Sequence, residues 1–267
     1  MIKLIISDMD GTLLNKHDEI DPEFWDIEKR LSKEGVIFSI ASGRPYYNLV
    51  KKFDQIKDNL LFICENGGFA VYKGQELFSN PMDFKDVDEI AKICNNLKGV
   101  ITLLCGKKSA YVEKDRFLNN SIETQNEIRR YYNNLELIED IKEIDDDIVK
   151  IAICDILGAE TNSYPILEKY KDRFQVVISG AIWIDLSKLG TNKGMAIEKI
   201  QEKLNISQDE TMAFGDYLND YEMMKYAKYS YAMKNAHPEL IAISNFITKD
   251  DNNNNGVTNT IKEIFNM

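Results

Sequence analysis

Short apolar runs alternate with amphipathic segments along the first part of the chain. Residues 2–7, 36–41 and 60–64 are apolar, contain β-branched side chains, and each run ends at a turn-forming sequence. Between the first two runs, residues 22–33 carry apolar side chains at helical spacing, and a second helix is expected over residues 45–53. This order predicts a βαβαβ arrangement with a parallel sheet covered on both faces.

The pattern changes after the third run. A hairpin is expected over residues 69–78, where Lys73-Gly74 separates two short apolar segments. The segments that follow mix helices and antiparallel strands: helices at 83–97, 115–132 and 164–170, and strands at 100–105, 110–113, 148–153, 174–179 and 182–186. We therefore expect an inserted α+β module over residues 83–187, which splits a discontinuous α/β domain formed by residues 1–82 and 188–267.

The alternation of short apolar runs with amphipathic segments returns in the last third of the chain. Helices are expected at 195–204, 220–227 and 258–265, and strands at 211–214, 229–233 and 246–248. The predicted fold class is α/β, a doubly wound and mostly parallel Rossmann-like sheet with the inserted α+β module. Ligands of such sheets bind beyond the carboxyl ends of the strands. Polar residues follow several of these ends: Asp8, Asp10, Ser42, Asn66, Asp216, Asn219 and Asp220.

The carboxylates in this set suit a hard cation. Asp8 and Asp10 can approach one site from the same side, because strand side chains alternate between faces. Together with Asp216 they favour Mg²⁺, which takes one or two carboxylates plus water and phosphate oxygens. Ser42 and Lys193 would suit a tetrahedral dianion, so the set predicts phosphoryl transfer. Taken singly, each residue also has a local interpretation: the aspartates stabilise turns, Ser42 caps a helix, and Lys193 is a solvated lysine.

The net charge, the cysteines and the apolar runs limit the kinds of partner and the location that are expected for the chain. The 267 residues carry a formal net charge of −11 with a pI near 4.9, which disfavours nucleic acid and anionic membranes as partners. The four cysteines are scattered along apolar runs and are expected to be buried thiols. The first residues become acidic too early for a signal peptide, and no apolar run approaches the roughly 18 residues of a membrane span. A cytoplasmic location is expected.

Four ordered motifs carry a resemblance to a known family. D-M-D-G-T-L at 8–13, A-S-G-R at 41–44, N-K-G at 192–194 and G-D-Y-L-N-D at 215–220 resemble the motifs of the haloacid dehalogenase-like hydrolases. The long insert between the second and third motifs resembles a class II cap of subtype B. The resemblance implies that residues 83–187 form an α+β cap domain, and that residues 1–82 and 188–267 form the catalytic core domain. E-N-G-G at 65–68, A-M-K-N-A at 232–236 and N-G-V at 255–257 are similar to the Cof-type phosphatases.

The resemblance implies a role for each motif residue. Asp8 would be the nucleophile and a magnesium ligand, and Asp10 the general acid/base with its backbone carbonyl on the metal. Asp216 would complete the metal ligands, and Asp220 would support them. The implied phosphate- and substrate-binding residues are Ser42, Gly43, Arg44, Asn66, Gly67, Lys193 and Asn219. The substrate would be a small phosphorylated metabolite, such as a sugar phosphate or a phosphorylated cofactor, and the protein a monomer or small homo-oligomer.

Two alternatives stay open and one is disfavoured. A sugar phosphomutase of the same superfamily shares the first motif and a similar cap. The second alternative, which is not an enzyme, is a catalytically silent phosphate-binding protein. A dehalogenase is disfavoured, because Asp10 supplies the acid/base that cleavage of a phosphate ester needs. One departure is the stretch before Lys193, where a proline is usual in the family and D-L-S-K-L-G-T stands here.

Overall fold

The computed structural model describes residues 1–267, which divide into two compact units. The first unit comprises Met1–Gly43, Phe53–Phe78 and Asn192–Met267, and the second, inserted unit comprises Arg44–Lys52 and Ser79–Thr191. The segment 44–52 groups with the inserted unit, whereas the sequence-based division places it in the core domain. The functional division into a catalytic core and a cap stays a prediction.

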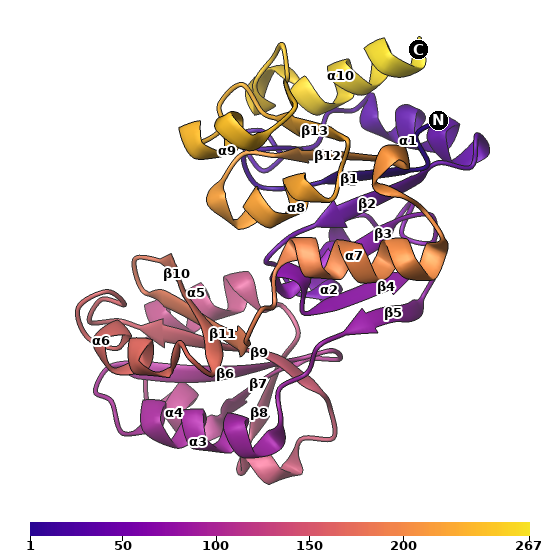
Figure 1. Cartoon of the computed structure of the whole chain (residues 1–267). Coiled ribbons are helices and arrows are strands. Elements are labelled where there is room, and N and C mark those ends of the chain that lie inside the picture. Colours follow the sequence, from indigo (N-terminus) through magenta and orange to yellow (C-terminus); the bar gives the residue numbers. More distant parts are fainter. The chain divides into compact units, whose positions relative to one another are not determined.

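The first unit is built on an eight-stranded sheet in the order β14-β13-β12-β1-β2-β3-β4-β5 (Figure 1). All pairs from β14 to β3 are parallel, and β4 runs antiparallel to β3. This confirms the doubly wound, mostly parallel sheet. The strands are β1 (Leu4–Ser7), β2 (Ile37–Ala41), β3 (Leu61–Cys64), β4 (Phe69–Tyr72), β5 (Gln75–Ser79), β12 (Thr211–Gly215), β13 (Tyr229–Ala232) and β14 (Phe246–Ile247).

Strand register sets the positions of the polar residues that follow. β1 lies between β2 and β12, with Leu4 opposite Thr211 and Ser7 opposite Phe214. The Asp8 amide continues the ladder by donating to the Phe214 carbonyl at 2.9 Å. Since the two strands are parallel and end in register, the residues that leave them emerge side by side at one edge of the sheet.

Helices cover both faces of this sheet. Figure 1 shows α1 and α10 on one side and α7 and α8 on the other. α1 turns Phe24, Ile27 and Leu31 inward, and the Phe24 ring packs edge-on against Phe38 of β2 with the ring centroids 5.0 Å apart. The helices of this unit are α1 (Phe24–Lys33), α7 (Lys193–Leu204), α8 (Tyr221–Lys225), α9 (Pro238–Ile243) and α10 (Gly256–Phe265).

The inserted unit has its own six-stranded sheet in the order β10-β11-β9-β6-β7-β8. Separate apolar clusters cover its two faces, so every residue of the central β9 is buried. The strands are β6 (Val100–Gly106), β7 (Ala110–Glu113), β8 (Leu135–Ile138), β9 (Ile148–Asp155), β10 (Phe174–Gly180) and β11 (Trp183–Lys188). The helices are α2 (Tyr46–Lys52), α3 (Phe84–Asn95), α4 (Lys114–Leu118), α5 (Ile122–Tyr131) and α6 (Tyr164–Leu167). This α+β unit matches the sequence prediction in class and in most elements.

The structure corrects three element predictions. The helix expected over 115–132 is two helices, because Ser121 starts α5 as an N-cap whose side chain accepts from the Thr124 amide. Strand β8 was not predicted, since it is a short edge strand in which only Ile138 is buried. Helix α9 was also not predicted; it begins at Pro238, after an N-cap at His237.

Two further sequence predictions concern the state of the cysteines and the presence of membrane-spanning segments. All four cysteines are free and buried. Burial raises the pKa of the Cys94 and Cys154 thiols to about 12, so both are poor nucleophiles in the folded protein. None of the helices is both long enough and apolar enough to traverse a lipid bilayer.

Candidate active site

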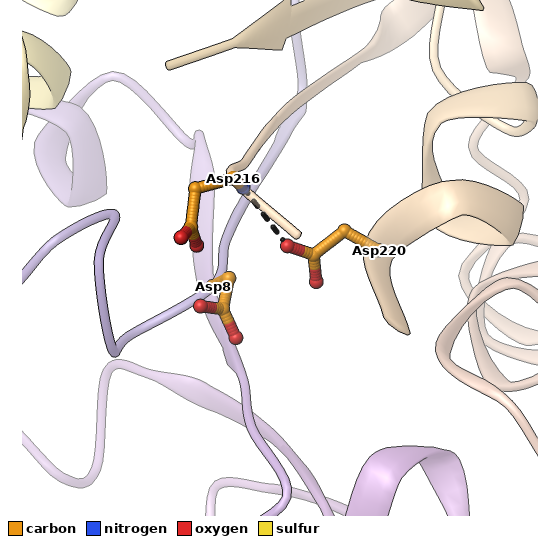
Figure 2. A group of neighbouring side chains, drawn as sticks. All are labelled: Asp8, Asp216 and Asp220. Carbon is orange, nitrogen blue, oxygen red and sulfur yellow. Dashed lines mark hydrogen bonds between the residues drawn. The ribbon is translucent and has the colours of Figure 1, made fainter. Parts of the chain in front are cut away.

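Three aspartates converge where β1 and β12 end (Figure 2). Asp8 directly follows β1 and is only 6% exposed. Asp216 directly follows β12, and Asp220 ends the 3-10 turn Leu218–Asp220. One carboxylate oxygen of Asp220 accepts from the Asp216 amide at 3.0 Å and from the Tyr217 amide at 3.3 Å. The turn therefore folds Asp220 back towards the strand end that carries Asp216.

A buried lysine lies within this acidic group. Lys193 is the first residue of α7, after an N-cap at Asn192 whose side chain accepts from the Met195 amide at 2.8 Å. Its ammonium group has 0% exposure, forms a short hydrogen-bonded ion pair with Asp8, and forms a second one with Asp220 at 2.6 Å. A lysine this deeply buried needs such partners, because an isolated buried charge is strongly unfavourable.

The charges of the group do not cancel. Burial raises the pKa of Asp8 well above its ordinary value, and the charge of Asp220 raises it further, while Lys193 opposes both effects. Burial and the charge of Asp220 raise the pKa of Asp216 to about 6. Burial opposes the charge on Lys193, but Asp220 and Asp8 raise its pKa above the ordinary value. The cluster therefore contains three carboxylates and one ammonium group, and this excess of negative charge favours the binding of a further cation.

The donor set fits a hard divalent cation. One carboxylate oxygen from each of Asp8, Asp216 and Asp220 lies within 4.8 Å of the others. Oxygen donors of this kind suit Mg²⁺. Both oxygens of Asp220 already have partners, one in Lys193 and the other in the backbone amides, so Asp8 and Asp216 are the better direct ligands. Asp10 does not belong to this group, and the coordination expected from its backbone carbonyl stays a prediction.

The turn after Asp10 is held against Asp216. Gly11 has a φ of +79°, and a Cβ at this position would lie 2.3 Å from a carboxylate oxygen of Asp216. Only glycine allows this backbone conformation and this approach together. The Thr12 hydroxyl donates to the other carboxylate oxygen of Asp216 at 2.8 Å. Sequence reasoning gave Thr12 no role, although it belongs to the first motif.

Ser42 and the segment Glu65–Gly67 follow the paired strands β2 and β3, and they are in contact there. Ser42 follows β2, is 2% exposed, and accepts the Asn66 amide on its carbonyl at 3.0 Å. Glu65 and Asn66 have positive φ angles of 52° and 53°, which non-glycine residues adopt at a cost of about 1–3 kcal/mol. At Gly67 a Cβ would lie 2.2 Å from the Asn192 carbonyl oxygen. The strained segment is thus bonded to Ser42 through Asn66, and its Gly67 lies next to the start of α7.

The three remaining predicted residues, Gly43, Asn219 and Arg44, have different surroundings. Gly43 lies against the Asn66 amide group, which a Cβ on Gly43 would meet at 2.9 Å. Asn219 belongs to the same turn as Asp220 and is exposed. Arg44 belongs to the inserted unit by its contacts. The substrate-binding roles of these three residues stay predictions.

Comparison with known proteins identifies the family. The sequence profile of the haloacid dehalogenase-like hydrolases matches residues 5–261. The chain is 30% identical to the 5-amino-6-(5-phospho-D-ribitylamino)uracil phosphatase YbjI of Escherichia coli K12, over 98% of this chain and 96% of that protein. It is 29% identical to a protein of Bacillus subtilis named as a phosphatase, YxeH, over 99% and 98% of the two chains.

Solved structures agree with these sequence matches. The crystal structure of SMU.1108c from Streptococcus mutans superimposes with a TM-score of 0.85 at 30% identity, and covers 100% of both chains. The subclass IIB sugar phosphatase BT4131 shares the fold with a TM-score of 0.77 at 18% identity, over 99% of this chain and 100% of that one. The resemblance first noted in the four ordered motifs is thereby confirmed. The chain belongs to the haloacid dehalogenase-like hydrolases and is a phosphatase of the Cof type.

Proposed function

We propose that this phosphatase is Mg²⁺-dependent and hydrolyses small phosphate monoesters through an aspartyl-phosphate on Asp8. The observation that carries the proposal is the buried ion pair of Lys193 with Asp8 and Asp220, next to the carboxylate of Asp216. A buried carboxylate that is paired with an ammonium group at the end of a strand is suited to attack an electrophilic centre. The same ammonium group can neutralise charge on the phosphoryl oxygens in the transition state.

The first half of the reaction transfers the phosphoryl group to Asp8. A carboxylate oxygen of Asp8 attacks phosphorus, and the bond between phosphorus and the ester oxygen breaks. The Asp10 carboxyl gives its proton to the departing oxygen, which leaves as an alcohol. Lys193 and Ser42 hold the phosphoryl oxygens during this step, in the roles that the sequence resemblance implies.

The second half releases phosphate. A water molecule attacks the phosphorus of the aspartyl-phosphate and gives a proton to the Asp10 carboxylate. The bond between phosphorus and the Asp8 oxygen breaks, which restores both carboxyl groups to their starting states. Asp8 and Asp216 would hold Mg²⁺, and when bound this ion supplies charge neutralisation for the transferring phosphoryl group.

The substrate proposal is a small phosphorylated metabolite, either a sugar phosphate or a phosphorylated cofactor precursor. Two relatives support the second class. The Escherichia coli relative and the Bacillus subtilis protein YitU, which is 26% identical over 98% of its own length, are both named as phosphatases of 5-amino-6-(5-phospho-D-ribitylamino)uracil. That compound carries its phosphate on an acyclic polyol chain. We therefore propose phosphorylated polyols and sugars as the substrates to examine first.

The direct test is the release of inorganic phosphate. We expect the purified protein to liberate phosphate from 4-nitrophenyl phosphate and from sugar and polyol phosphates when Mg²⁺ is present. Removal of the metal with EDTA should abolish the release, and added Mg²⁺ should restore it. Turnover that persists in EDTA would contradict the metal requirement, and isomerised sugar phosphate without free phosphate would favour a mutase. No turnover with any of these esters would favour a phosphate-binding protein without catalysis.

Asp216→Ala should weaken activation by Mg²⁺ more than it weakens substrate binding. The change removes one carboxylate of the acidic group, and we expect the Mg²⁺ concentration for half-activation to rise by about 10- to 100-fold. A titration of activity against Mg²⁺ at saturating 4-nitrophenyl phosphate measures this shift. The matched control is Asp209→Ala, at an exposed aspartate just before β12, which should leave the curve unchanged. An unchanged curve for Asp216→Ala would place the metal elsewhere.

A further inference from the structure

The turn that follows Asp10 is held by side chains from the far end of the sequence. The Gly11 carbonyl accepts a hydrogen bond of 2.9 Å from the side-chain amide of Asn235. Asn235 lies 224 residues further along the chain, in the loop after β13. Its own side-chain oxygen accepts from the Asn252 backbone amide at 3.1 Å. Asn235 therefore connects the turn to a second C-terminal segment.

That second segment contacts the turn directly. The Asn252 side-chain amide donates to the Leu14 carbonyl at 2.8 Å. The Asn253 side-chain oxygen accepts from the Lys16 backbone amide at 2.9 Å. Three asparagine side chains thus hold two carbonyls of the turn after Asp10 and one amide of the residues that follow it. We call them the asparagine clasp: Asn235, Asn252 and Asn253.

The loop that carries Asn235 also holds the strand end at Asp216. The Met233 amide donates to the Gly215 carbonyl at 2.9 Å, and the His237 amide donates to the Asp216 carbonyl at 2.8 Å. Residues 233–237 therefore connect the backbone of Asp216 to that of Gly11.

These bonds are better suited to fixing geometry than to stabilising the fold. Asn235 and Asn253 are exposed, and a typical hydrogen bond adds only about 0.5–1.5 kcal/mol to stability. A neutral amide can both donate and accept without adding charge beside three carboxylates. Proton transfer, in contrast, needs heavy atoms about 2.6–3.2 Å apart, and a displacement of about 1 Å can cost roughly 100-fold in rate.

We propose that the asparagine clasp fixes the position of Asp10 for proton transfer, which makes Asn235 and Asn252 positioning residues for the general acid. This inference rests on the proposed function, in which Asp10 protonates the departing oxygen. A clasp with this role matters most for esters whose alcohol is a poor leaving group, because those need the proton. A clasp that only stabilises the fold affects all esters equally.

The test compares two aryl phosphates for Asn235→Ala and for Asn252→Ala. Phenyl phosphate releases a phenol with a pKa of about 10, as in tyrosine, and depends on protonation. 4-Nitrophenyl phosphate releases a much better leaving group. We expect kcat/KM for phenyl phosphate to fall by about 10- to 100-fold, and kcat/KM for 4-nitrophenyl phosphate by less than about threefold. The double variant should be no worse than the single ones, because residues that act as one unit are not additive.

The matched control is Asn254→Ala. Asn254 belongs to the same asparagine tract, but its side chain bonds only to Asp251 at 2.8 Å, so both substrates should be unaffected. Equal losses on the two substrates in the clasp variants, or no loss on either, would overturn the inference while wild-type turnover still upheld the proposed function. Absence of phosphate release by the wild-type protein would count against the function itself.

Discussion

Asp8→Asn should abolish turnover and leave the protein folded. The amide is not a competent nucleophile towards phosphorus, so no aspartyl-phosphate can form. Asparagine has nearly the same shape and can still accept the hydrogen bond that Lys193 donates to Asp8. We therefore expect a native circular dichroism spectrum, together with a kcat below about one hundredth of the wild-type value, since even loss of acid/base catalysis costs about 10²–10⁴.

The control for this variant is the same exchange at an exposed position. Asp54→Asn changes an aspartate whose side chain is 73% exposed and pairs only with Lys57, and it should keep full activity. A second measurement strengthens the assignment: a rapid acid quench of the wild-type protein during turnover should trap phosphate on the chain, and Asp8→Asn should trap none. Asp8→Asn with more than about a hundredth of wild-type kcat would remove Asp8 from the role of nucleophile.

Lys193→Met should reduce both stability and activity. Methionine fills a similar volume without charge, so the buried carboxylates of Asp8 and Asp220 would lose the cation that both contact. Removal of one partner from a buried ion pair costs about 3–5 kcal/mol. Urea unfolding measures this loss, and phosphate release should fall because the phosphoryl oxygens lose their positive partner.

The comparison for Lys193 lies on the same helix. Lys199→Met removes a lysine of α7 that is 43% exposed and pairs with Glu202 at 3.0 Å. Exposed pairs contribute about 0–1 kcal/mol, so this variant should unfold at nearly the wild-type urea concentration. Added Mg²⁺ should return part of the stability that Lys193→Met loses, since a second cation can compensate the same carboxylates. Wild-type stability in Lys193→Met without Mg²⁺ would contradict the ion-pair account of the site.

Much of this site is predictable because its residues lie at strand ends. An apolar run such as 2–7 favours a buried strand because it is short, contains β-branched residues and ends at a turn sequence, and the residue that stops it then lies at an edge of the sheet. The same reasoning places Ser42, Asn66 and Asp216. Lys193 is harder to place, because a lysine at a helix start is commonly solvated. Apart from the resemblance of its N-K-G motif, nothing local marks Lys193, and its complete burial between Asp8 and Asp220 is visible only in the structure.

Contacts between distant segments were not predictable in the same way. Nothing local to Thr12 indicates that its hydroxyl meets Asp216, which lies 204 residues away. The positive φ angles of Glu65 and Asn66 are equally hidden, because neither residue type requires that conformation. Edge strand β8 has little hydrophobic signal, because most of its side chains face solvent. The break between α4 and α5 depends on a serine cap within a polar segment, which helical periodicity alone does not reveal.

The ion pair between Lys193 and Asp8 also has a consequence for synthesis of the protein. The two residues are 185 positions apart, so at about 5–20 residues per second the lysine is made roughly 10–40 s after the aspartate. During that interval β1 lacks its β12 neighbour, and the Asp8 carboxylate has no ammonium partner. A nascent chain that stops before residue 193 therefore cannot assemble the pair. Catalytic competence would then arrive late in translation, after the whole inserted unit has been made.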